Sequence, residues 1–142
     1  MISQKSFKGV PYPITKNPKG FFYIQSGVDQ VKSDMIVLLL TNPRERVMLH
    51  DFGTPLRKLF FNPNDPSTIL EAKGMIANSL KMWEPRVAIE NIYIQSKLDS
   101  DSANPDDPDP NNEHVLLIRI TFFDRLDIRT INELRLEVPL GA

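Results

Sequence analysis

The segment from Pro66 to Lys97 contains a helix pattern that must end at a proline and give way at once to a strand pattern. Five large or apolar residues recur at offsets of three and four and so line one side of a helix: Ile69, Ala72, Ile76, Leu80 and Trp83. Pro85 cannot continue that helix, and it disfavours the α conformation at Glu84. We therefore expect the helix to stop near Trp83 and a strand to begin at Arg86.

A second helix is predicted over residues 27–41. Its apolar residues again follow helical spacing: Val28, Val31, Met35, Leu38 and Leu39. Asn42-Pro43 should end it. Val47 to Leu49 is predicted to be a short extended piece, and Leu56 to Phe60 one or two helical turns. Asp65 or Ser67 could cap the helix that follows.

Three strands complete the pattern. The first runs from Arg86 to Lys97. Its apolar residues change from one face of the strand to the other partway along, and a bulge near Asn91 would explain the change. The second alternates cleanly at Leu116, Ile118, Ile120 and Phe122, and the third at Leu134, Leu136 and Val138. Two main helices followed by a three-stranded antiparallel β-meander predict an α+β domain over residues 27–142.

Two segments lie outside this pattern. Residues 1–26 mix prolines, glycines and aromatic residues, so we expect an extended N-terminal arm that lies on its own domain or on a neighbouring subunit. Residues 98–112 are rich in aspartate and proline and are predicted to form a flexible acidic loop. The aspartates could instead bind calcium, but prolines interrupt their spacing and the turn glycine of an EF-hand is missing.

The composition argues against several classes of function. With 17 Lys plus Arg against 18 Asp plus Glu, no global charge favours nucleic acid or an anionic membrane. The absence of cysteine rules out disulfides and thiolate metal sites, and two distant histidines, His50 and His114, lack the spacing of a zinc site. The run from Met35 to Leu40 is too short to cross a bilayer. We expect no cofactor, no metal and a protein that is soluble and cytosolic when made.

Glu84 and Arg86 carry the chemistry that most needs an explanation. A carboxylate and a guanidinium two residues apart on a rigid corner can pair with each other. Each can instead form bidentate hydrogen bonds with a partner chain. The spacing leaves both possibilities open.

The run from Met82 to Val87, together with Glu45-Arg46 and Phe52-Gly53, resembles the gene-25-like family of contractile-tail baseplate proteins. The resemblance covers roughly Val28 to Leu136. The sequence departs from it at Arg44, where glycine is usual, and in the long acidic loop.

The resemblance implies a structural baseplate protein and not an enzyme. Glu84, Pro85 and Arg86 would bind the core bundle of baseplate wedge proteins. Glu45 and Arg46 would mainly form a structural turn and would contribute to an interface as a secondary role. The C-terminal sheet would initiate the tail sheath by accepting a strand of the sheath protein. It further implies about six copies per baseplate, a possible contact with the tail tube, a place in the virion tail and assembly in the host cytoplasm.

Two alternatives remain open. The first is a lysozyme-like peptidoglycan hydrolase with Glu84 as the acid, but a guanidinium two residues away favours the ionised carboxylate, which is the wrong form for a general acid. No partner carboxylate is singled out. The second alternative is a baseplate subunit of a type VI secretion system, which would share the fold and the contacts.

Overall fold

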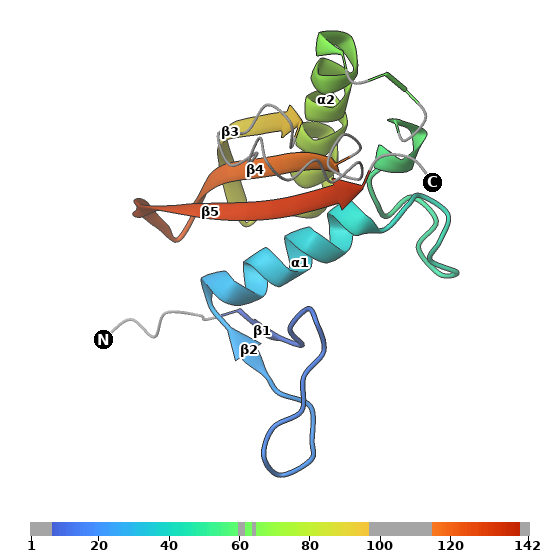
Figure 1. Cartoon of the computed structure of the whole chain (residues 1–142). Helices are drawn as coiled ribbons and strands as arrows, with labels where there is room; N and C mark the ends of the chain where they lie inside the picture. Colours follow the sequence, from blue (N-terminus) through green and yellow to red (C-terminus); the bar gives the residue numbers. More distant parts are fainter. Residues whose placement is uncertain (1–6, 60–61, 64, 97–114, 140–142) are drawn as a thin grey trace, which may run out of the picture.

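The computed structural model describes residues 7–59, 62–63, 65–96 and 115–139. Helix α1 (Val28–Leu40) and helix α2 (Pro66–Trp83) cover a sheet made of β3 (Val87–Ser96), β4 (Val115–Asp124) and β5 (Asp127–Pro139). α2 packs along β3, and α1 contacts α2 and β5 (Figure 1). The predicted α+β architecture is confirmed. The acidic residues 98–112, the calcium alternative and His114 lie outside the described residues.

The α2 helix has the bounds that its sequence predicts. Asp65 is the N-cap, and its carboxylate accepts the backbone N–H of Thr68 at 2.8 Å. Pro66 occupies the first turn, where its missing N–H costs nothing. The predicted apolar side of the helix packs inward: Ala72, Ile76 and Leu80 are fully buried, and Ile69 and Trp83 lie against them.

The sheet is an antiparallel meander in the order β3-β4-β5. The register between β3 and β4 shifts between Ile89 and Asn91, so the predicted bulge is confirmed. Alternate residues of β4 face the helices and are buried: Leu116, Ile118, Ile120 and Phe122. Leu134 and Val138 of β5 complete that buried layer. The third strand starts earlier than its apolar alternation indicates, because β5 already pairs with β4 beside the Arg125-Leu126 turn.

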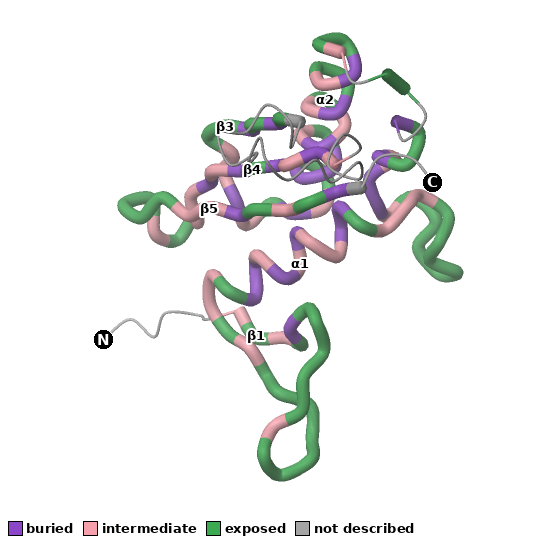
Figure 2. The backbone as a smooth tube through the Cα atoms, in the orientation of Figure 1, coloured by how far each residue is buried: buried purple, intermediate pink, exposed green. Residues whose placement is uncertain are grey.

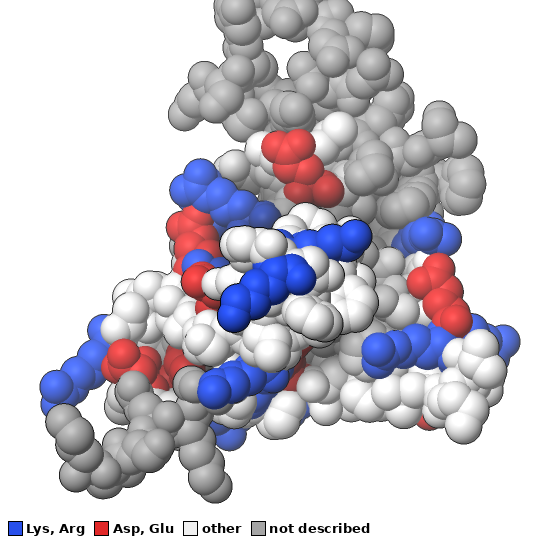
Figure 3. Space-filling model, turned by 90° about the horizontal axis from the view of Figure 1, so that it is seen from below, with Lys and Arg blue, Asp and Glu red and all other residues white. Residues whose placement is uncertain are grey.

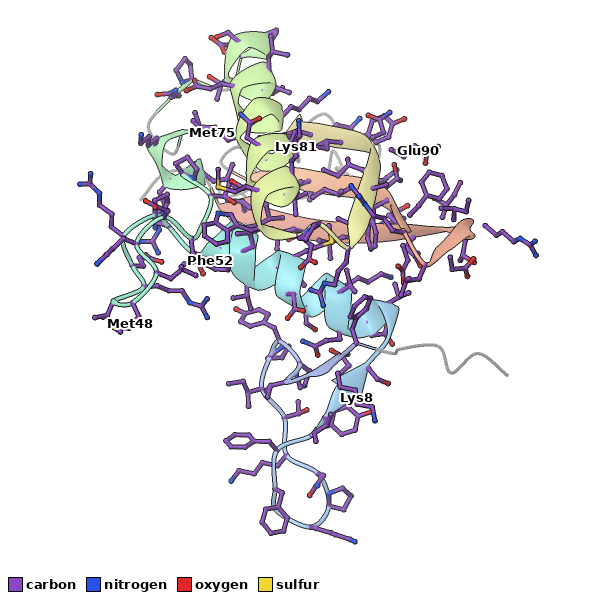
Figure 4. The ribbon with its side chains drawn as sticks, turned by 180° about the vertical axis from the view of Figure 1, so that it is seen from behind. Lys8, Met48, Phe52, Met75, Lys81 and Glu90 are labelled. Atoms are coloured by element: carbon purple, nitrogen blue, oxygen red, sulfur yellow. The ribbon has the colours of Figure 1, made fainter. Side chains whose placement is uncertain are left out.

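The loop between α1 and the 3-10 helix η1 (Leu56–Leu59) corrects one prediction. Val47 to Leu49 forms bends and no strand, and Val47 and Met48 are almost fully exposed. The backbone N–H of Arg44 donates to the carbonyl of His50 at 2.7 Å and closes the loop on itself. Met48 therefore lies at the far end of the loop, away from the helices (Figure 4). The predicted helical turns are present as η1.

Gly53 fixes where this loop returns to the domain. Its φ is 128°, and a Cβ there would lie 2.4 Å from the carbonyl oxygen of Thr41. The next residue, Thr54, donates its N–H to the same oxygen at 2.8 Å. Glycine is required because the backbone approaches the end of α1 too closely for any side chain.

The predicted N-terminal arm folds into a hairpin-like projection. Strand β1 (Lys8–Gly9) pairs antiparallel with β2 (Gln25–Ser26), and the residues between them extend away from the domain (Figure 1). Most of this projection is exposed (Figure 2). We call residues 7–26 the N-terminal finger. Among the described residues, no helix has both the length and the apolar content needed to cross a bilayer.

Candidate protein-binding corner

The end of α2 makes the sharp corner that its proline predicts. Glu84 has left the helical region, with φ −125° and ψ 69°, while its N–H still donates to the carbonyl of Leu80. The N–H of Val87 donates to the carbonyl of Glu84 at 3.4 Å, which closes a turn around Pro85 and Arg86. Pro85 is left exposed at the outside of the turn. The corner presents a rigid apolar ring to solvent because both flanking residues are tied to the domain.

Glu84 and Arg86 pair with each other. Arg86 donates through Nε and Nη2 to the two carboxylate oxygens of Glu84, and the Nη2–Oε2 distance is 2.6 Å. Only 6% of the Glu84 side chain is exposed, against 26% for Arg86. Of the two arrangements that the spacing left open, the structure has the local ion pair.

A second carboxylate holds the same guanidinium. Nη2 of Arg86 lies 2.7 Å from Oδ2 of Asp34, which comes from α1. The hydrogen bonds from Glu84 first, and then Asp34, raise the pKa of Arg86 above its ordinary value, although burial opposes them. Arg86 is therefore a permanent cation that joins α1 to the start of β3. Because both oxygens of Glu84 accept from it, Glu84 is not arranged as a proton donor.

The network continues from α1 into the N-terminal finger. Gln30 donates to Oδ1 of Asp34 at 2.8 Å and to the carbonyl of Val10 at 3.2 Å. The guanidinium of Arg86 also lies over the ring of Phe7, 4.8 Å from its centroid. The corner thus fixes the base of the finger.

Glu45 closes a turn, the structural role that the resemblance implied, because its backbone N–H donates to the carbonyl of Asn42 at 3.2 Å. The Glu45 carboxylate accepts the backbone N–H of Asn42 at 2.8 Å, which lowers the pKa of Glu45, and it lies 3.4 Å from Arg57. Arg44 adopts φ 75°, so the left-handed turn is kept without glycine.

An aromatic pair connects that turn to α2. The guanidinium of Arg46 lies 4.4 Å above the centroid of Phe52, and the Phe52 ring meets Trp83 edge to face at 5.4 Å. Trp83 directly precedes Glu84. The turn that contains Arg46 is thus connected to the end of α2 through two ring contacts.

A groove of about 330 Å³ lies beside the corner. It is lined by Ala77, Leu80, Lys81, Glu84, Pro85, Val87, Ala88, Ile89 and Arg125. Lys81 projects from α2 on the side where β3 runs (Figure 4), and the backbone N–H of Arg125 donates to the carbonyl of Arg86 at 3.0 Å. We call this surface the corner groove. It has an apolar floor, an exposed proline and two cations on its rim.

A larger groove, of about 420 Å³, lies on the face of the sheet that points away from the helices. Its charged lining is largely satisfied within the sheet, since Arg119 and Arg135 both lie beside Glu133. The hydrogen bond from Arg135, aided by Arg119 and Lys32, lowers the pKa of Glu133. Within the described ranges, no group of three or more acidic or histidine side chains is placed to hold a metal ion.

Sequence reasoning missed Phe7, Gln30 and Asp34 as parts of the corner. Asp34 is 52 positions from Arg86, so no local spacing could indicate the pair. The only signal was Gln30 four residues before Asp34, a spacing that puts both side chains on one side of a helix.

The fold defines a small α+β domain in which two helices cover a three-stranded antiparallel meander. A family model described as baseplate wedge protein gp25 matches residues 25–123, so the chain belongs to that family. The family is one of baseplate wedge proteins, so this protein is a structural component of a baseplate.

Solved structures share the fold at low sequence identity. A chain of the anti-feeding prophage baseplate is 22% identical with a TM-score of 0.66, and the match covers 83% of this chain and 85% of that one. A Geobacter sulfurreducens protein solved as a "putative tail lysozyme" is 22% identical with a TM-score of 0.67, covering 84% and 96%.

A chain of the type VI secretion baseplate complex is 16% identical with a TM-score of 0.57, covering 81% and 94%. A comparison with curated protein sequences finds no match. At these identities the structural matches establish the fold alone.

Proposed function

We propose that this protein binds the wedge core of its baseplate through the corner groove and initiates the sheath from the edge of β5. Family membership and the structure of the corner support the first part. The corner offers an exposed proline held at a fixed position, and rigid surfaces bind with a smaller loss of conformational entropy. Its partners would be the wedge core, the sheath protein and, at the tail axis, the tube.

The single observation that carries the proposal is the internal pairing of Arg86. Because Glu84 and Asp34 hold the guanidinium, Arg86 serves the interface by fixing Pro85 and the groove floor, and its partly exposed side remains free to touch a partner. Lys81 and Arg125 then supply the charges that meet carboxylates of the wedge proteins. Arg46, whose guanidinium lies over Phe52, and the turn that Glu45 closes would add a second contact with the wedge core beside Trp83.

The direct test is binding of the purified wedge proteins from the same gene cluster. Lys81→Glu combined with Arg125→Glu should weaken binding by about tenfold or more, since like charges would face the partner's carboxylates. The matched control is Lys58→Glu with Arg129→Glu, two exposed cations that do not line the groove. Equal binding by the groove variant and the control would rule out the corner groove as the wedge site.

The edge of β5 supports the second part of the proposal. In the described sheet, β3 and β5 are the outer strands, and β3 is interrupted by its bulge. β5 has a register shift of its own after Asp127, but from Ile131 to Pro139 it pairs regularly with β4 and presents the exposed Ile131. A strand of the sheath protein would add to β5 by main-chain hydrogen bonds.

Six copies per baseplate follow if this baseplate shares the six-fold symmetry imposed on the anti-feeding prophage baseplate. The protein would then lie in the tail baseplate of the particle after assembly in the host cytoplasm. A type VI secretion baseplate is the second candidate, favoured by the similarity to a chain of that complex. The genes beside this one distinguish the two, because a phage cluster encodes capsid proteins and a secretion cluster does not.

A further inference from the structure

The N-terminal finger is an apolar projection. Phe21 is 72% exposed, Phe22 65% and Ile14 66%. Val10, Tyr12, Tyr23 and Ile24 are exposed as well. Single exposed apolar residues are ordinary, but this many on one projection mark an interaction surface.

The charge on the finger has one sign only. Lys8, Lys16 and Lys19 stand among its apolar residues, and the sequence contains no aspartate or glutamate before Asp29. The molecule seen from the side of the finger shows Lys or Arg side chains set among uncharged residues (Figure 3). These three lysines give residues 7–26 a net positive charge, whereas the chain as a whole has a net charge of −1. A complementary surface must therefore be negative.

The finger is ordered at its tip. The side-chain oxygen of Asn17 accepts the N–H groups of Lys19 and Phe21 at 2.9 and 3.1 Å. The N–H of Asn17 donates to the carbonyl of Phe21 at 2.7 Å, and that of Tyr23 to Thr15 at 3.0 Å. This turn presents Phe21 and Phe22 in a fixed arrangement.

The base of the finger is ordered as well. Phe7 lies under Arg86, and its carbonyl accepts the N–H of Gly27 at 2.8 Å. Gln30 binds the carbonyl of Val10, and the hydroxyl of Ser33 donates to the side chain of Gln25 at 2.8 Å. An element ordered at both ends loses less entropy on binding than a free tail.

We propose that the finger inserts into an apolar cleft edged by carboxylates on a baseplate subunit other than the wedge core. This inference rests on the protein being a baseplate component, but not on the corner groove being the wedge site. Phe21 and Phe22 would fill the cleft, and Lys16 and Lys19 would pair with its carboxylates. The corner network sets the direction in which the finger points, because Arg86, Asp34 and Gln30 hold its base.

A protein cleft suits the finger better than a lipid bilayer. Lys16, Asn17 and Lys19 are at the tip, so insertion into lipid would carry two cations and a polar turn ahead of or beside the phenylalanines. In a protein cleft, carboxylates and backbone groups can satisfy each of them. The lysines then contribute to recognition and association rate.

The experiment measures binding of the full chain to each of the other baseplate proteins of its gene cluster, purified separately, by biolayer interferometry. One variant carries Phe21→Ser with Phe22→Ser, and a second carries Lys16→Glu with Lys19→Glu. The controls are Leu70→Ser, an equally exposed apolar residue on α2, and Lys58→Glu. Unchanged unfolding midpoints establish that the finger variants fold.

The proposal predicts that one protein outside the wedge core binds the wild type and the controls alike. It should lose about tenfold or more of its affinity for the phenylalanine variant. The lysine variant should associate more slowly, and added salt should slow the wild type toward the same rate. Both variants should keep their affinity for the wedge core, so a failure of the corner groove is measured separately from a failure of the finger.

Three results would overturn the proposal. The first is that no cluster protein distinguishes the phenylalanine variant from Leu70→Ser. The second is that the wild type floats with vesicles of phosphatidylcholine and phosphatidylglycerol and the variant does not, which would make the finger a membrane element. The third is that sedimentation shows a dimer of this chain that the variant abolishes, since the occupant would then be a second copy.

Discussion

At the scale of single residues, Arg86 does more than its spacing from Glu84 indicates. It joins the end of α2 to α1 through Asp34 and covers Phe7 at the base of the finger. The pairing with Glu84 could be foreseen from two residues on a proline corner. The pairing with Asp34 could not, because it depends on how two helices pack.

Replacing Arg86 should therefore affect stability as well as binding. Arg86→Gln leaves the carboxylate of Glu84 buried without its cation, and we expect a loss of roughly 2–4 kcal/mol in the free energy of unfolding. Chemical denaturation measures it. The control is Arg135→Gln, whose pair with Glu133 is exposed and should contribute little. Equal losses in the two variants would mean that the Arg86 network is no stronger than a surface pair.

Arg44 holds a conformation that its side chain disfavours. Its φ of 75° costs an L residue about 1 kcal/mol, and glycine adopts it freely. Arg44→Gly should therefore raise the free energy of unfolding by up to about 1 kcal/mol. Arg44→Ala removes the same charge and keeps the Cβ, so it should give no such gain. A gain as large in the alanine variant would trace the effect to charge and not to backbone conformation.

At the scale of elements, the local sequence predicts an element correctly where its apolar spacing and the residues that end it agree. The bounds of α2, the bulge in β3 and the alternation of β4 all follow from residues near one another in sequence. Val47 to Leu49 is apolar enough for a strand but pairs with no strand among the described residues, and a strand cannot form alone. The pairing of β1 with β2 brings together residues on either side of a segment rich in proline and glycine, which the sequence pattern does not indicate.

The N-cap of α2 gives a pH-dependent prediction. The N–H of Thr68 lowers the pKa of Asp65 below its ordinary value of 3.8. The folded state therefore binds the proton more weakly than the unfolded state. The cap contributes its full stabilisation of the folded state when the pH is above the ordinary pKa, and this contribution is lost as the pH falls through the lowered pKa. Asp65→Ala should lower the unfolding midpoint at neutral pH.

The difference from wild type should shrink as the pH falls below 3.8. Thermal unfolding over a series of acidic buffers measures it. Asp51→Ala, which changes an exposed aspartate outside any helix, is the control. A difference between Asp65→Ala and wild type that stays constant throughout the acid range would contradict the capping role.

The edge of β5 gives a prediction for sheath initiation. An added strand would set its side chains beside Ile131, so Ile131→Lys removes one cross-strand pair and places a charge on the edge. We expect the amount of sheath that polymerises from purified sheath protein to fall roughly two- to fivefold, because one cross-strand pair contributes up to about 1 kcal/mol. Leu126→Lys, in the exposed turn before β5, is the control. Undiminished polymerisation with Ile131→Lys would argue against β5 as the edge.

At the scale of the whole molecule, the two proposed interaction surfaces, the corner groove and the finger, are connected through the domain. The corner groove lies between α2 and β3, and the finger extends from the start of α1 (Figure 1). The Arg86 network runs between them, through Asp34 and Gln30. If both surfaces bind as proposed, the network holds the two neighbouring proteins at fixed relative positions.

The most direct test of the central claim is a cryo-electron microscopy map of the assembled tail. We predict density of a wedge-core protein lying in the corner groove, in contact with Pro85, Lys81 and Arg125. A map in which that groove faces open solvent, with the wedge core bound elsewhere on the domain, would contradict it.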